Sequence, residues 1–211
     1  MRSLFLIALA AASVSTFAET ATLVGTFGKT EVGTGTFTIT PQRDRTMTEN
    51  TVFKIALNGQ KIEVQSTVHI SQEGMTLRAD QKEVVNGAVQ KDVSIQYTLK
   101  AAIVTNKATG EKKTYPIPVG AKTTDPSGLW FVTSKPKIGA KSVATAFSVD
   151  LFAWRKTVRV YVGDQPFTLD GKKIVGHQLK DDSDGHTVLA LVDDHGLPLD
   201  LDLAGFHFTR K

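Results

Sequence analysis

The chain has 211 residues, a formal net charge of +4 and no cysteine. This length suits one domain with a full core, and the missing cysteines exclude disulfide bonds and a Cys-linked lipid anchor. The charge excess is small and its lysines and arginines are scattered, so nucleic acid is not indicated as a partner, because that partner calls for clustered basic residues.

The first residues show the order of features found in secretory signal peptides. The basic Arg2 precedes an apolar core over 4–12, and Ala18 supplies a small residue for cleavage, with cleavage after Ser15 as an alternative. The apolar core is too short to cross a bilayer of about 30 Å.

The chain is therefore expected to divide into a signal peptide over 1–18 and a single β-rich domain over 19–211. No later stretch approaches the roughly 18 consecutive apolar residues that a membrane-spanning helix requires. We expect a periplasmic or secreted protein with no membrane span.

Apolar and polar residues alternate through much of the chain, as they do in half-buried strands. The pattern predicts a Thr-rich strand pair over 20–40 and strands over 61–70, 93–103 and 197–203. The polar segment 41–51 is expected to be a loop.

Four dipeptides mark hairpin turns because they accept positive φ at both central positions. They are Asn58-Gly59, Asn86-Gly87, Asp170-Gly171 and Asp184-Gly185. One short helix is predicted over Asp125–Ser134, with Asp125 as N-cap, Pro126 at the first helical position and a stop at Lys135-Pro136.

These elements predict an all-β fold, with ten or so antiparallel strands and almost no helix. A large curved antiparallel sheet, forming a half-barrel or barrel with one short helix, fits this pattern, and a sandwich is the alternative.

The segment 180–196, KDDSDGHTVLALVDDHG, concentrates aspartate and histidine and raises the question of a metal site. A calcium loop aligned on its aspartates would place Lys180 at the first ligand position and Leu191 at the twelfth, where a glutamate is required. His186 and His195 would lie about 30 Å apart along an extended strand, too far to share a zinc ion.

The same segment is explained by two turns with a strand between them. Turns are predicted at Asp182–Gly185 and Asp193–Gly196, since Asp bonds its own backbone in turns and Gly takes the left-handed position. The apolar run between them predicts a strand buried on both faces. If 197–208 returned as one antiparallel strand, His207 would lie beside Asp184 and His186, the one place where metal ligands would converge.

Catalytic motifs are sparse. The chain has no cysteine nucleophile and no G-x-S-x-G elbow, and its five histidines form no recognisable dyad in the sequence. A Ser/His/Asp site assembled from distant strands stays open.

Four turn and packing motifs span the mature chain, at Lys29 to Gly33, Asp125 to Phe131, Pro136 to Gly139 and Val192 to Leu199. In these four motifs the chain resembles a family of bacterial exported β-sheet proteins whose function is not established. The resemblance implies an all-β fold, similar to the open half-barrels of periplasmic lipoprotein carriers, and a structural role for the Asp-Asp-His-Gly turn.

Apolar side chains gather in the second half of the chain and form the expected binding site. They are Leu129, Trp130, Phe131, Phe152 and Trp154, with Phe147 nearby. Core packing is the favoured alternative explanation of these side chains, because aromatic residues dominate cores. We expect a pocket beside Trp130 that accepts an acyl chain, under a helix that acts as a lid.

The expected function is that of an exported, non-enzymatic envelope protein that binds an apolar small molecule, a lipid or a lipid-bearing partner, with no cofactor and no metal. The alternatives are a hydrolase with a dispersed polar site and a module that pairs an edge strand with a partner.

Overall fold

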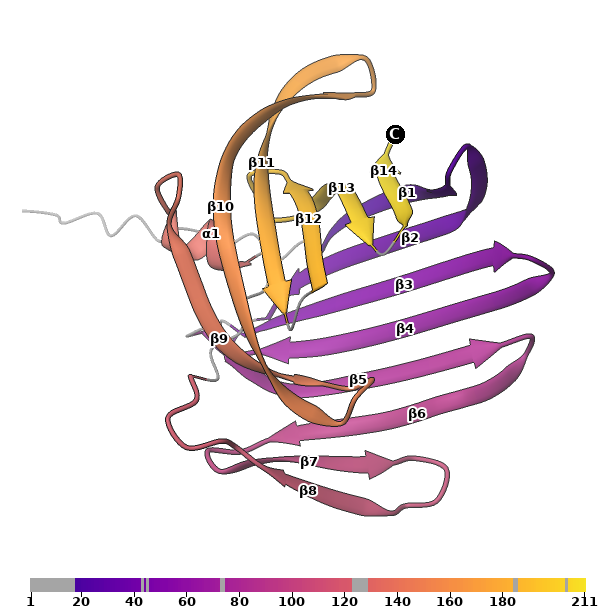
Figure 1. Ribbon diagram of the computed structural model, residues 1–211, viewed down its shortest axis with the longest axis vertical. Coiled ribbons are helices and arrows are strands. Elements are labelled where there is room, and N and C mark those ends of the chain that lie inside the picture. Colours follow the sequence, from indigo (N-terminus) through magenta and orange to yellow (C-terminus); the bar gives the residue numbers. More distant parts are fainter. Residues whose placement is uncertain are drawn as a thin grey trace, which may run out of the picture.

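The computed structural model describes residues 18–42, 44, 46–72, 75–122, 129–183, 186–203 and 205–211. In this part of the chain, 14 strands form one large, curved, antiparallel sheet beside a single short helix (Figure 1). The predicted all-β fold with an open, curved sheet is confirmed. The elements are β1 (Glu19–Phe27), β2 (Thr30–Pro41), β3 (Met47–Leu57), β4 (Gln60–Ile70), β5 (Thr76–Val85), β6 (Ala88–Tyr97), β7 (Ala101–Asn106), β8 (Lys112–Pro116), α1 (Leu129–Ser134), β9 (Lys141–Ser148), β10 (Ala153–Leu169), β11 (Lys172–Ser183), β12 (His186–Val192), β13 (Pro198–Leu203) and β14 (Phe206–Arg210).

The sheet is a meander in which the first and last strands of the chain pair with each other in the middle of the sheet. The strand order is β8-β7-β6-β5-β4-β3-β2-β1-β14-β13-β12-β11-β10-β9, so the first and last strands are neighbours. β8 and β9 form the two outer edges of the sheet, although they follow one another along the chain.

Three of the four predicted turn dipeptides lie at hairpin tips with positive φ at both residues. Asn58 and Gly59 have φ values of 52° and 75°, and the pairs at 86–87 and 170–171 behave in the same way. The fourth dipeptide, 184–185, lies outside the described residues. So does 123–128, which includes the start of the predicted helix, and α1 occupies the end of that prediction.

One strand prediction and one loop prediction are wrong in their boundaries. Residues 93–103 are not one strand, because β6 ends at Tyr97 and β7 begins at Ala101. The hydroxyl Oγ1 of Thr98 accepts hydrogen bonds from the backbone N–H groups of Lys100 and Ala101 and so closes a tight turn.

The expected loop over 41–51 is also mostly strand, because β2 continues to Pro41 and β3 begins at Met47. Polar side chains in this region bond across the sheet. The Thr67 hydroxyl, for example, donates to Asn50 Oδ1 at 2.8 Å.

The prediction that the strand after 185 is buried on both faces is wrong as well. In β12, Leu189 is 38% exposed while Val192 is buried, so only one face of this strand packs against the interior. A continuous apolar run did not require two covered faces here.

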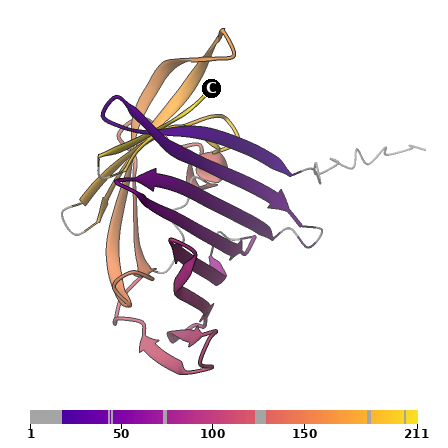
Figure 2. The same cartoon turned by 90° about the vertical axis from the view of Figure 1, so that its right-hand side faces the viewer.

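The sheet curls until its edges approach one another (Figure 2), as the twist between neighbouring strands accumulates. The indole Nε1 of Trp154 in β10 donates a hydrogen bond to the backbone carbonyl of Tyr115 in β8, at 3.1 Å. Lys91 in β6 forms an ion pair with Asp150 at the β9–β10 turn, at 2.6 Å. β9 and β10 therefore lie across the concave face formed by β5–β8.

Most of the buried apolar residues fall into three clusters. The edge cluster joins β5–β7 to β9 and contains Ala79, Val93, Ile95, Ala102, Val104 and Phe147. The central cluster joins β1 to β13 and β14 and contains Ala21, Leu23, Leu197, Leu201 and Phe208. The helix cluster contains Tyr161, Leu179 and Val192, against which Trp130 and Phe131 of α1 pack.

Candidate functional site

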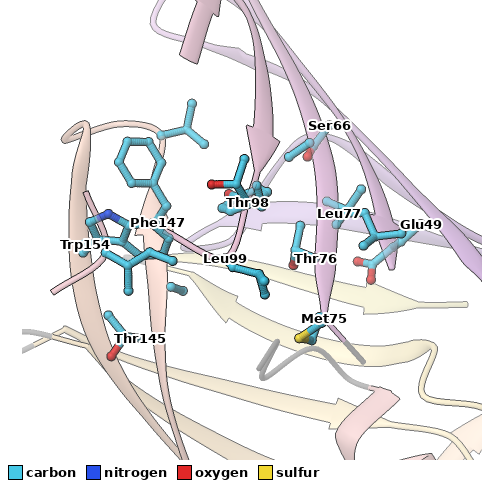
Figure 3. A pocket seen from close by; sticks show the side chains of 16 residues that line it. Glu49, Ser66, Met75, Thr76, Leu77, Thr98, Leu99, Thr145, Phe147 and Trp154 are labelled. Carbon is cyan, nitrogen blue, oxygen red and sulfur yellow. The ribbon is translucent and has the colours of Figure 1, made fainter. Parts of the chain in front are cut away.

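A cavity of about 600 Å³ lies where β9 and β10 cross the concave face of the sheet. One wall comes from β3–β6 and includes Ser66, Val68 and Ala79. The other wall comes from β9 and β10 and includes Phe147 and Trp154 (Figure 3). Because these walls belong to opposite halves of the sheet, the cavity exists only in the curled structure.

The aromatic wall is held by contacts on several sides. The Trp154 ring meets Phe147 and Tyr97 edge to face, with centroid separations of 5.4 and 6.2 Å. Tyr115 packs against Phe147 at 5.1 Å and stacks on Phe152 at 6.2 Å. Such aromatic pairs add to the stability that burial provides, so the indole of Trp154 is fixed at the cavity.

The lining is mostly apolar, with a few polar groups at separate points. The lining residues with hydroxyl groups are Ser66, Thr76, Tyr97, Thr98 and Thr145, and one carboxyl group comes from Glu49. This combination of apolar walls and few polar groups is typical of small-molecule sites.

A second cavity of about 170 Å³ shares Glu49 with the first and lies between β2–β3 and β10–β13. Its lining includes Arg159 and Asp181, which form a two-pronged ion pair across β10 and β11. Both side chains are largely buried, so the Arg159 and Asp181 charges balance one another where water has little access.

The five residues expected to form one binding site lie in two places. Phe152 and Trp154 pack against the edge cluster, and of the five residues Trp154 lines the 600 Å³ cavity. Trp130 and Phe131 lie on α1 against the helix cluster, and the Leu129 side chain is outside the described part of the structure. The described side chains of α1 therefore pack against β10–β12, and none of them lines this cavity.

The Asp-Asp-His-Gly segment is a turn, as predicted. Asp193 Oδ1 accepts hydrogen bonds from the backbone N–H groups of His195 and Leu197, at 2.9 and 3.0 Å. Gly196 has a φ of 82° and donates its N–H to the Asp193 carbonyl. Arg210 Nη1 donates to Asp193 Oδ2 at 3.0 Å, which fastens the turn to the last strand.

The single return strand over 197–208, on which an approach of His207 to Asp184 and His186 depended, does not form. Residues 198–210 form two strands, and β13 lies between β12 and the strand that carries His207. His207 Nε2 instead lies 3.1 Å from Asp200 Oδ2. Among the described residues, no group of three or more His, Cys, Asp or Glu side chains is placed to hold a metal ion.

A polar network that the sequence did not reveal surrounds His177. Its Nδ1 lies 2.7 Å from Asp164 Oδ1, and its Nε2 lies 2.8 Å from Asp194 Oδ1. The Tyr161 hydroxyl donates to the same oxygen of Asp164, and the Phe131 ring of α1 stacks on the imidazole at 4.3 Å. Both nitrogens face carboxylate oxygens, so both must carry hydrogen for the two bonds to form together.

The network shifts the ionisation of its members. Burial acts to lower the pKa of His177, but the hydrogen bonds and charges of Asp194 and Asp164 outweigh it, and the pKa lies above its ordinary value of 6.5. Hydrogen bonds from Tyr161 and His177 hold the pKa of Asp164 below its ordinary range. Burial and the bond to Asp164 raise the pKa of Tyr161 to about 12.

The Asp194→Asn substitution is expected to lower the pKa of His177, because it removes one of the two carboxylates that favour the imidazolium. Since the folded pKa is raised, charged His177 stabilises the fold below pH 6.5, and this contribution is lost as the pH rises through the raised value. The stability difference between wild type and variant should therefore shrink as the pH rises through that window.

NMR titration of the imidazole, together with denaturant unfolding at several pH values, measures both effects. Asp150→Asn is the matched control, because Asp150 is an exposed carboxylate whose partner is Lys91. An unchanged His177 pKa in Asp194→Asn would show that the Nε2 contact does not persist in solution.

In the part of the chain that the structure describes, no helix has the length and apolar character needed to cross a membrane.

Comparison with solved structures shows where else this fold occurs. A β-barrel-like protein with a domain of unknown function, DUF1849, from Brucella abortus aligns with a TM-score of 0.65 and 13% sequence identity, over 91% of this chain and 94% of that chain. A DUF1089 family protein from Pseudomonas aeruginosa aligns with a TM-score of 0.45 and 12% identity, over 95% and 97% of the two chains. No protein-family model matches the sequence, and no curated protein sequence does.

At 13% sequence identity, the similarity to the Brucella abortus protein concerns the fold alone. The TM-score of the Pseudomonas aeruginosa protein is too low to carry an argument. The expected similarity to β-sheet proteins of unknown function is confirmed at the level of the fold.

Proposed function

We propose that this chain is an exported protein that binds an acyl chain, or a similarly apolar molecule, in the cavity between β3–β6 and β9–β10. The cavity itself carries the proposal. Its volume of about 600 Å³ falls within the roughly 300–1,000 Å³ of small-molecule sites, and its lining has the same mixed character.

Physical chemistry favours an apolar ligand over a polar one at this place. An acyl chain placed between Val68, Ala79 and Trp154 would remove its own surface and theirs from water, which is the main source of binding free energy for apolar molecules. The cavity offers separate hydroxyl groups and one carboxyl group, too few to replace the hydration of a strongly polar ligand.

The hydrolase alternative would rely on the His177 network, where titratable groups with shifted pKa values meet. There His177 bonds two carboxylates and stacks on Phe131, while the raised pKa of Tyr161 makes its hydroxyl harder to ionise at neutral pH. These contacts favour a structural role that fastens α1 and the turn at 193–196 to β10 and β11.

Export is proposed from the N-terminal pattern of a basic residue, an apolar core and a small residue at 18. Because β1 begins at Glu19, removal of 1–18 would leave every described strand whole. Intact-mass analysis of the protein recovered from outside the cytoplasm should give an N-terminus at Glu19. A retained Met1 would contradict export by this route.

The binding proposal is tested by titrating the delipidated mature protein with palmitate and with phosphatidylglycerol. Two variants separate the two tryptophan signals, because Trp130→Phe leaves Trp154 and Trp154→Phe leaves Trp130. Ligand is expected to change the fluorescence of Trp130→Phe far more than that of Trp154→Phe, since Trp154 lines the cavity and Trp130 packs elsewhere.

Native mass spectrometry gives the stoichiometry without relying on fluorescence, and one ligand per chain is expected. If neither lipid binds saturably, the proposed function is wrong. If binding occurs and only the Trp130 signal responds, the ligand lies beside α1, as the sequence alone suggested, and not in this cavity.

A further inference from the structure

Two aliphatic side chains on adjoining segments face solvent, and one of them, Leu99, lies at the cavity. Leu99, in the turn between β6 and β7, is 93% exposed and also contributes to the cavity lining. Val119, which follows β8, is fully exposed at 106% of its reference area. The two segments are joined next to these residues, because the Ile117 N–H donates to the Lys100 carbonyl at 2.8 Å. Single exposed aliphatic residues are common, but two on joined segments, one of which lines an apolar cavity, are more informative.

The apolar surface continues from Val119 onto the edge strand β9. A shallow hollow there is lined by Val119, Lys122, Val143 and Lys156. The Thr145 N–H donates to the Lys122 carbonyl at 2.6 Å, which holds this segment against β9. We call the surface formed by Leu99, Val119 and Val143 with Lys100, Lys122 and Lys156 the basic rim.

The charges of the basic rim are of one sign. Its three lysines are exposed, and the segments that form it, 98–100, 117–122, 143–145 and 154–157, contain no Asp or Glu. The nearly neutral chain therefore presents a local positive surface beside exposed aliphatic groups. Exposed aliphatic groups beside lysine are typical of surfaces that insert shallowly at the boundary of an anionic bilayer.

We propose that the basic rim docks on the surface of a lipid bilayer that carries negative charge, and that the cavity exchanges an acyl chain with that bilayer. The proposal rests on the proposed function, since it names the source of the ligand. Leu99 and Val119 enter the boundary between headgroups and chains, while the three lysines meet lipid phosphates. The cavity opening at Leu99 then faces the bilayer, so an acyl chain moves between the two without crossing open water.

The test is co-sedimentation of the mature protein with vesicles of phosphatidylcholine alone or mixed with phosphatidylglycerol. Binding is expected to mixed vesicles and to weaken as salt is added, because salt screens the lysine charges. Val119→Asp should weaken binding at least about tenfold through lost apolar burial. The triple variant Lys100→Glu, Lys122→Glu, Lys156→Glu should lose the preference for phosphatidylglycerol.

The controls are Val89→Asp and Val175→Asp, since these valines are 54% and 55% exposed and lie outside the basic rim. Both should bind vesicles like wild type. Val119 and the three lysines do not line the 600 Å³ cavity, so their variants should still bind soluble palmitate, with unchanged melting temperatures.

If wild type ignores mixed vesicles but binds soluble palmitate, the docking proposal fails and the binding function stands. If palmitate also fails to bind, the proposed function fails too. If the protein self-associates without vesicles and Val119→Asp makes it monomeric, the basic rim is an interface between two copies, which also overturns the docking proposal.

Discussion

The Ser66→Phe substitution is expected to weaken acyl-chain binding at least about tenfold while leaving the protein folded. Ser66 lies on β4 and lines the cavity (Figure 3). A phenyl ring at this position would occupy part of the 600 Å³ that a ligand needs. Since the ring extends into a cavity and not into close-packed core, the strain that accompanies overpacking should be small.

The matched control is Gln65→Phe, which adds the same ring to the neighbouring position on the opposite, exposed face of β4. Palmitate titration followed by native mass spectrometry compares the two variants with wild type, and circular dichroism confirms that both are folded. Wild-type affinity in Ser66→Phe, or an equal loss in both variants, would show that the ligand does not enter between these walls.

The Phe208→Ala substitution is expected to lower the free energy of unfolding by about 3–5 kcal/mol, the usual cost of removing a buried phenyl ring. Phe208 in β14 is 1% exposed and is among the largest fully buried side chains. Its ring meets Phe53 at a centroid separation of 4.9 Å. A Cβ built on Gly25 would lie 2.5 Å from the Phe208 ring, so the ring occupies space that glycine leaves open and no neighbour would refill.

Phe206→Ala, two residues earlier in the same strand, is the control because Phe206 is only partly buried and contacts the exposed Phe27. Urea unfolding should show a clearly smaller loss in this variant. Equal losses would mean that the central cluster is not the main source of stability around β14.

Several features of the fold were determined locally and could be predicted. An Asn or Asp followed by Gly readily adopts positive φ at both residues, so the hairpin predictions at 58–59, 86–87 and 170–171 were correct. Asp193 bonds its own turn through the side chain, which is equally local. Alternation of apolar residues gave the strands and the all-β class.

Predictions failed where the local signal was absent or ambiguous. The turn at 98–100 has no Gly, Pro or Asn, and a threonine hydroxyl closes it, so two strands were taken for one. Residues 48–51 are polar, yet β2 and β4 on either side pair with their backbone, and β4 bonds the side chains of Thr48 and Asn50. The polar residues indicated a loop because the sequence does not show that β2 and β4 lie on either side of this segment.

The sequence by itself determined many of the strand-forming segments, the turns at 58–59, 86–87, 170–171 and 193–196, and the absence of disulfide chemistry, because these depend on residues close together in the chain. Only the tertiary structure placed Ser66 opposite Trp154, separated the residues of α1 from Trp154, and brought Asp164 and Asp194 to His177. The physical reason is curvature. The twist between neighbouring strands accumulates over all 14 strands. The distance between the two edges of the sheet depends on this total twist, which no single segment of the sequence encodes.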